Sequence, residues 1–147
     1  MALATLGSGG YSVKPLHEKL GYKEGQKIAF VGPPSELSDL TASAPFGKVA
    51  KRQNWSRPLG GSDYDIIHAF TKSREEIVAN LPRLRRAVKS DGMIWVSWPK
   101  KAAKVETDVT EDVVRDEALK LDMVDVKVAA VDNVWSGLKL VVRVECR

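Results

Sequence analysis

The sequence predicts a single α/β domain in which a mostly parallel sheet lies between two layers of helices and ends in an antiparallel hairpin. Two observations predict this fold. Short apolar runs alternate with helical patterns over residues 27–121, an order typical of parallel strands joined by right-handed crossovers. The last two apolar runs, 124–131 and 138–144, are separated by only the six residues 132–137. That connection is too short for a crossover and predicts a hairpin, with strand 138–144 inserted between strands 93–98 and 124–131.

The first half of the chain predicts a helix, a strand and a second helix. Pro15–Gly21 begins with proline and ends with glycine, the usual ends of a short helix. The apolar run Lys27–Val31 predicts the first strand, and a helix is expected to start near Ser35. Prolines and glycines in residues 44–63 leave room for one short strand near Val49 and otherwise predict loop.

The second half gives clearer patterns. Residues 64–71 and 93–98 are almost continuously apolar, as expected of strands covered on both faces. Residues 74–88 and 110–121 have apolar side chains at helical spacing. Pro82 lies inside the first of these helices, so a kink or break is expected there.

Composition restricts the class of protein. The 147 residues carry 23 Lys and Arg against 19 Asp and Glu, a formal net charge of +4. One cysteine and two histidines exclude a disulfide framework and a multi-cysteine metal site. No apolar run is long enough to cross a membrane, and the first residues lack the basic start of a signal peptide. We expect a cytoplasmic protein with a flexible tail over residues 1–12 and one domain over residues 13–147.

The predicted order of elements resembles the Rossmann-like fold of class I methyltransferases, in truncated form. Between the first strand and the strand at Tyr64 there is room for one strand where those enzymes carry two. The resemblance implies S-adenosylmethionine at the turn after the first strand. Here Pro33 and Pro34 remove two N–H donors from that turn, and residues 51–54 are basic or amide where a ribose-binding acid is expected. The Tyr64 strand also lacks an acidic or Asn-Pro-Pro motif at its end. We therefore expect neither S-adenosylmethionine nor NAD, and no other cofactor or metal.

Other catalytic groups are sparse. His68 lies in an apolar strand and is interpreted as a hydrogen-bonded core residue, whereas His17 has no implied partner. Cys146 has no basic cluster beside it and is expected to be exposed and unreactive. Ser35 and Ser136 have no histidine in a recognisable relation to them, so no catalytic triad is predicted.

Seven Lys and Arg residues lie between Arg83 and Lys104, against the single acid Asp91. Arg85, Arg86 and Lys89 are expected in the last turn of one helix, where cations complement the helix dipole. The next helix is acidic. Asp108 and Glu111 have the spacing of a capping box for that helix. A solvated pair of charged helices is favoured over a nucleic-acid site, which is kept as an alternative.

Several short segments resemble a small bacterial family catalogued as domain of unknown function 3052. The resemblance implies a bacterial cytoplasmic protein with a small Rossmann-like domain, and it supplies no reaction. The segments that carry it are Tyr11-Ser12, Pro15-Leu16, Lys19-Leu20-Gly21, Trp98-Pro99-Lys100-Lys101, Asp108-Val109-Thr110-Glu111-Asp112-Val113-Val114-Arg115 and Trp135-Ser136-Gly137-Leu138.

A binding site is predicted at the carboxyl edge of the sheet, because ligands of open parallel sheets collect there. Loops 32–36, 98–110 and 132–137 should reach this edge. The candidate residues for an anionic ligand are Lys100, Lys101, Thr110, Asp132, Trp135 and Ser136. In the competing interpretation the two lysines neutralise Asp108, Glu111 and Asp132, while Trp135 packs in the hairpin against Trp98.

The favoured function is a non-catalytic binding or regulatory module that uses this edge for a small anionic ligand or a protein partner. One alternative is an enzyme with a remodelled site for a phosphorylated or anionic small molecule. A weak nucleic-acid binder that uses residues Arg83–Lys104 is the second, and no membrane partner is expected.

Overall fold

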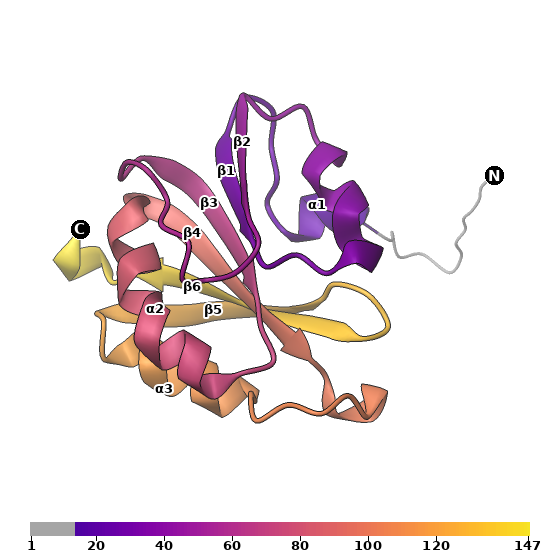
Figure 1. Cartoon of the computed structure of the whole chain (residues 1–147). Helices are drawn as coiled ribbons and strands as arrows, with labels where there is room; N and C mark the ends of the chain where they lie inside the picture. Colours follow the sequence, from indigo (N-terminus) through magenta and orange to yellow (C-terminus); the bar gives the residue numbers. More distant parts are fainter. Residues whose placement is uncertain (1–13) are drawn as a thin grey trace, which may run out of the picture.

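A computed structural model describes residues 14–147 (Figure 1), so the predicted tail over residues 1–12 lies outside the described residues. Six strands form one sheet in the order β2-β1-β3-β4-β6-β5. β1, β2, β3 and β4 are parallel, and β6 is antiparallel to both β4 and β5. The predicted insertion of β6 between β4 and β5 is therefore confirmed. The prediction that the chain forms a single strand, β2, between β1 and β3 in the sequence is also confirmed. The strands are β1 (Lys27–Val31), β2 (Lys48–Arg52), β3 (Tyr64–Phe70), β4 (Val88–Pro99), β5 (Met123–Ala130) and β6 (Trp135–Val142).

Helices cover the two faces of the sheet unequally (Figure 1). α2 (Arg74–Ala87) and α3 (Glu111–Leu119) bury apolar side chains such as Leu81 and Val114 in the larger core. The opposite face packs against one-turn α1 (Leu16–Lys19) and the 3-10 helix η1 (Ser35–Ala42). Two further 3-10 turns are η2 (Lys101–Ala103) and η3 (Val144–Cys146). No helix in residues 14–147 has the length and apolar character needed to span a membrane.

Three predicted details are wrong. α2 runs through Pro82 without a break; Val78, whose carbonyl loses its hydrogen bond, is 43% exposed, so water can satisfy that oxygen. β4 begins at Val88, because the residues after α2 pair directly with the start of β3. β6 begins at Trp135 and not at residue 138, so the hairpin turn is tighter than predicted.

The N-terminus of α2 gathers polar contacts from distant parts of the chain. Ser73 caps it, accepting a hydrogen bond from the Glu76 backbone N–H at 3.3 Å. Asp108 accepts a hydrogen bond from the Arg74 N–H at 2.7 Å, so it caps α2. Thr110 caps α3 instead, and the predicted Asp108–Glu111 capping box is wrong, because Asp108 reaches across to the neighbouring helix.

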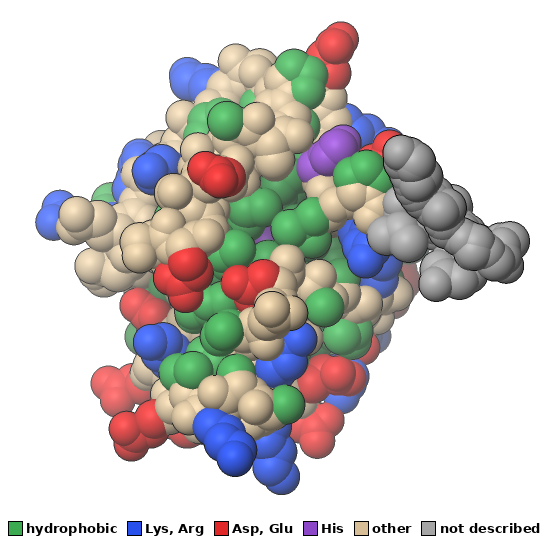
Figure 2. Space-filling view, turned by 90° about the vertical axis from the view of Figure 1, so that its right-hand side faces the viewer, with side chains coloured by type: hydrophobic (Ala, Val, Ile, Leu, Met, Phe, Trp, Pro, Cys, Tyr) green, Lys and Arg blue, Asp and Glu red, His purple; other side chains and the backbone are tan. Residues whose placement is uncertain are grey.

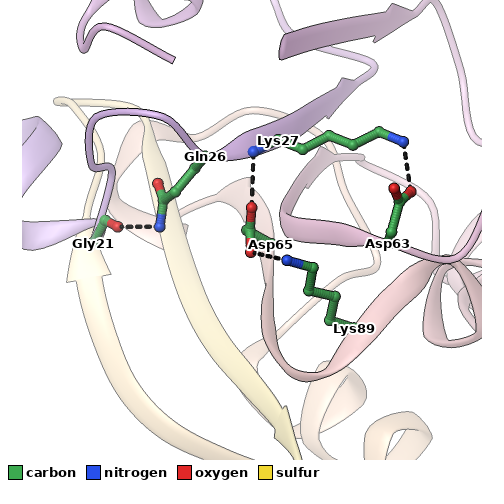
Figure 3. A network of polar contacts seen from close by, with 6 residues as sticks. All are labelled: Gly21, Gln26, Lys27, Asp63, Asp65 and Lys89. Carbon is green, nitrogen blue, oxygen red and sulfur yellow. Dashed lines mark hydrogen bonds and ion pairs between the residues drawn. The ribbon is translucent and has the colours of Figure 1, made fainter. Parts of the chain in front are cut away.

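Figure 3 shows a polar network at the beginning of β1 and β3. Asp65 accepts hydrogen bonds from the Lys27 backbone N–H at 2.8 Å and from Lys89 Nζ at 2.9 Å. Burial raises the pKa of Asp65, but these two donors outweigh it, and the pKa lies below its ordinary value. Lys27 Nζ pairs with Asp63, and this hydrogen bond lowers the pKa of Asp63. The side-chain charge of Lys27 is thus neutralised within the fold.

Candidate functional site

The strand order reverses at β1, which has β2 on one side and β3 on the other. The carboxyl ends of β1 and β3 define the crevice where open sheets of this kind bind ligands. Gly32 ties the end of β1 to the end of β2 beside this crevice: its N–H donates to the Arg52 carbonyl at 2.8 Å. A Cβ built on Gly32 would lie 2.8 Å from the Phe70 carbonyl oxygen, and its φ is +66°. Only glycine permits this approach of the two chain segments.

Trp55 closes the same region from the loop after β2. Its side chain is 1% exposed and belongs to the core cluster of Ala29 and Ala69, small residues of β1 and β3. The indole Nε1 donates to the Phe70 carbonyl at 2.8 Å. The pattern of residues 44–63 predicts one short strand near Val49 and otherwise loop, and it does not identify Trp55 as a buried residue. The signal for it is a tryptophan between two polar residues, Asn54 and Ser56, which indicates an anchored loop.

A hollow of about 320 Å³ remains beside this closure, and we call it the switch-point hollow. Glu76 contributes a carboxylate already engaged by the Thr71 hydroxyl at 2.6 Å and by the Trp55 N–H at 3.4 Å. The other residues that line the switch-point hollow are Gly32, Pro34, Glu36, Gln53, Asn54, Phe70, Lys72 and Trp135. Glu36, Thr71, Lys72 and Glu76 were not among the predicted site residues, although the Ser73–Glu76 spacing is a capping signal.

The fold implies S-adenosylmethionine at the turn after β1. That turn is Gly32-Pro33-Pro34, and its single N–H, on Gly32, already donates to the Arg52 carbonyl, whereas an anion-binding turn offers several free N–H groups. β2 ends at Arg52, whose guanidinium donates to the Pro58 and Lys51 carbonyls. The next residues, Gln53 and Asn54, are amides, so the segment directly after β2 supplies no carboxylate to hold ribose hydroxyls. The residues of this crevice do not fit S-adenosylmethionine.

A second hollow of about 540 Å³ lies between the carboxyl end of β4 and the segment that leads to α3; we call it the lysine hollow. It brings together four of the six predicted site residues, Lys100, Lys101, Thr110 and Ser136. Its remaining lining residues are Trp98, Pro99, Val105, Thr107, Val109 and Glu111. Figure 2 shows this side of the molecule, where hydrophobic side chains gather centrally and charged side chains surround them.

The two lysines of this hollow make no ion pair within residues 14–147. The carboxylates expected to neutralise them are engaged elsewhere. Asp108 caps α2, Glu111 pairs with Arg115, and Asp132 accepts two backbone N–H bonds. The prediction that these carboxylates neutralise Lys100 and Lys101 is thus wrong, because each carboxylate already binds a backbone N–H or pairs with Arg115.

Asp132 and Trp135 do not line the lysine hollow. Asp132 Oδ1 accepts from the N–H groups of Val134 and Trp135 at 2.8 and 2.6 Å, which fixes the hairpin turn. Trp135 packs edge-on against Phe70, with 5.6 Å between ring centroids. Trp135 and Trp98 belong to different core clusters on opposite faces of the sheet, so the predicted packing between them is wrong. Successive register positions of a strand point to opposite faces, and Trp98 pairs with Ser136.

His68 is a buried core residue, as predicted. Its Nδ1 lies 2.6 Å from the Tyr22 hydroxyl and its Nε2 2.7 Å from Ser97 Oγ. The ring stacks on Phe70 at 4.2 Å. Burial lowers the pKa of His68 to about 3, so the ring is neutral at physiological pH. Both ring nitrogens have partners, and His68 holds β3 and β4 to the N-terminal segment.

The other candidates gain no chemistry from the structure. Arg83 and Arg85 donate to the carbonyls of Ser56 and Leu121, and Lys89 pairs with Asp65; these cations have partners within the fold. Cys146 is exposed, as predicted. Within residues 14–147, no group of three His, Cys, Asp or Glu side chains has the arrangement of a metal site.

Comparison with solved structures identifies the fold as that of S-adenosylmethionine-dependent methyltransferases. An enzyme of this class from Aquifex aeolicus has a TM-score of 0.62 and 18% identity, with 84% of this chain and 85% of that chain covered. The magnesium protoporphyrin IX methyltransferase from Synechocystis, with bound S-adenosylhomocysteine, gives 0.60 and 13%, covering 81% and 74%. A TehB-like methyltransferase from Corynebacterium glutamicum gives 0.62 and 11%, covering 87% and 85%. No protein-family model and no curated protein matches the chain.

Proposed function

We propose that this chain is a non-catalytic binding module that has a methyltransferase-like fold but does not use the cofactor, and that takes a small anionic ligand in the lysine hollow. The observation that carries the proposal is the pair Lys100 and Lys101. They line a concave surface, and the three carboxylates that were expected to neutralise them, Asp108, Glu111 and Asp132, are committed to other partners.

The ligand chemistry follows from the lining. Two ammonium groups favour a phosphate or carboxylate, and the Ser136 hydroxyl supplies a further hydrogen-bonding group. Trp98 and Val109 add apolar wall, which suits an anion with a flat or aliphatic part. Glu111 also lines the hollow, but Arg115 pairs with its carboxylate, which reduces its repulsion of an anion.

Replacement of Lys100 and Lys101 by alanine tests this proposal. Calorimetric titration of wild type with inorganic phosphate and with adenosine monophosphate is expected to show binding, and the double variant should bind at least about tenfold more weakly. Unfolding in urea should be altered by no more than about 0.5 kcal/mol, because neither side chain has an ion pair to lose. The Lys23→Ala/Arg86→Ala variant removes the same charge at two exposed residues outside the lysine hollow and should bind like wild type.

The competing interpretation is that Lys100 and Lys101 have a structural role only. If the alanine variant of both lysines loses stability while wild type binds neither phosphate nor adenosine monophosphate, that interpretation holds and the proposal is wrong.

The second candidate is an enzyme, and the methyltransferase neighbours favour it. Binding of an anion followed by its chemical conversion on incubation would support that candidate. Membership of the small bacterial family of unknown function stays a prediction that rests on the short motifs, several of which line the lysine hollow.

A further inference from the structure

We propose that the outer edge of β2 is a docking site for an extended acidic peptide of a partner protein, which adds as a strand beside β2. β2 ends the sheet on one side (Figure 1). Within residues 14–147 its only strand neighbour is β1, so no strand of this part of the chain pairs with the other side of its backbone. An unprotected edge of this kind is a template for strand addition.

The hydrogen-bond pattern shows which backbone groups face outward. Lys48 donates from its N–H to the Gln26 carbonyl, and the Arg52 carbonyl accepts from Gly32, so both residues face β1. Successive residues of a strand direct their backbone N–H and C=O groups to opposite sides of the strand. The N–H and C=O of Val49 and Lys51 therefore point away from β1, toward the open edge. The Lys51 carbonyl accepts a bond from Arg52 Nη1, which leaves both groups of Val49 and the N–H of Lys51 for a partner.

A hollow lies beside each face of this edge. Lys48 and Ala50 line one of about 750 Å³, together with the Gly60-Gly61-Ser62 segment. Lys51 and Gln53 line the other, of about 490 Å³, against Pro33, Pro34 and Ser38. Side chains of an added strand alternate between two faces, so they would enter these hollows in turn.

The charge of the edge determines the partner. Lys48, Lys51 and Arg52 contribute three positive charges, and none of them has an ion pair within the described chain. The single acid of the hollows is Asp63, which Lys27 neutralises (Figure 3). Residues 1–13 contain no acidic residue and do not complement this charge, so an acidic segment of another protein is the occupant that fits.

The test is binding of a fluorescein-labelled peptide of alternating glutamate and valine, with a lysine–valine peptide of equal length as control. Wild type should bind the acidic peptide and not the basic one. Lys48→Glu/Lys51→Glu should weaken binding about tenfold or more. Lys23→Glu/Arg86→Glu makes the same charge change at two exposed residues and should leave binding unaltered.

Backbone readouts separate strand addition from simple charge attraction. Amide hydrogen exchange of Val49 and Lys51 should slow on binding, and Val49→Pro, which removes one outward donor, should weaken binding. If Val49→Pro fails to fold, amide hydrogen exchange on the wild-type protein still tests whether the peptide pairs with Val49 and Lys51. Absence of peptide binding, or binding without protection of these two amides, overturns the proposal. Self-association of the chain through this edge, detected by ultracentrifugation and lost in Val49→Pro, would overturn it in favour of a second copy.

Discussion

Replacing Trp55 by alanine is expected to lower the free energy of unfolding by about 3–5 kcal/mol, the usual cost of truncating a buried tryptophan. The indole is buried in the core cluster that also contains Ala29 and Ala69, and its removal leaves a cavity in that cluster. It also leaves the Phe70 carbonyl without its side-chain donor. Urea unfolding followed by circular dichroism measures the change.

A matched variant separates packing from hydrogen bonding. Trp55→Phe keeps a six-membered aromatic ring in the core but loses the Nε1 donor and part of the ring volume, so it should cost about 1–3 kcal/mol, less than the alanine variant. Equal stability of wild type and Trp55→Ala would show that the loop after β2 is not anchored as described, and that the crevice is open.

Acidification is expected to destabilise the protein through His68. The pKa of this ring is lowered to about 3 in the folded chain, whereas an unfolded histidine titrates near pH 6.5. The unfolded chain therefore binds an additional proton between these values, and the free energy of unfolding falls by about 1.4 kcal/mol per pH unit as the pH decreases below about 6. The contribution is fully present above the unfolded pKa and is lost on acidification.

The variant His68→Phe identifies the source of this slope. It has no ring proton to bind, so its stability should vary little between about pH 6 and 5, above the range in which Asp63 and Asp65 lose their contribution. If wild type and variant lose stability in parallel over that interval, the ring is not held neutral. Where His68→Phe does not fold, a nuclear magnetic resonance titration of the His68 ring in wild type measures directly whether the ring stays neutral between about pH 6 and 5.

Most of the fold could be predicted because its signals are local. The buried strands β3 and β4 are near-continuous apolar runs, and the short connection before β6 requires an antiparallel pair. What could not be predicted depends on tertiary contacts. Asp108 has the spacing to cap α3 but instead accepts a hydrogen bond at the N-terminus of α2. Pro82 is tolerated inside α2 because the helix is exposed to water at Val78.

The site was predicted in part. Lys100, Lys101, Thr110 and Ser136 meet in one hollow because β4 and β6 are neighbours and the segment before α3 folds back beside them. Trp135 follows Asp132 closely in the chain, but the pleat of β6 directs its side chain to the other face. Trp55 could not be placed from the sequence, since it is buried in a core cluster with residues of β1 and β3 and donates to the Phe70 carbonyl at the end of β3.

Titration of the purified protein with S-adenosylmethionine by calorimetry tests the central claim most directly. The claim is that this methyltransferase-like fold does not use the cofactor, because the turn Gly32-Pro33-Pro34 has no free N–H for an anion and the residues directly after β2 carry no carboxylate. The expected result is no measurable heat of binding, in a preparation that binds phosphate or adenosine monophosphate through Lys100 and Lys101. A dissociation constant in the micromolar range, or S-adenosylmethionine that copurifies with the chain, would contradict it.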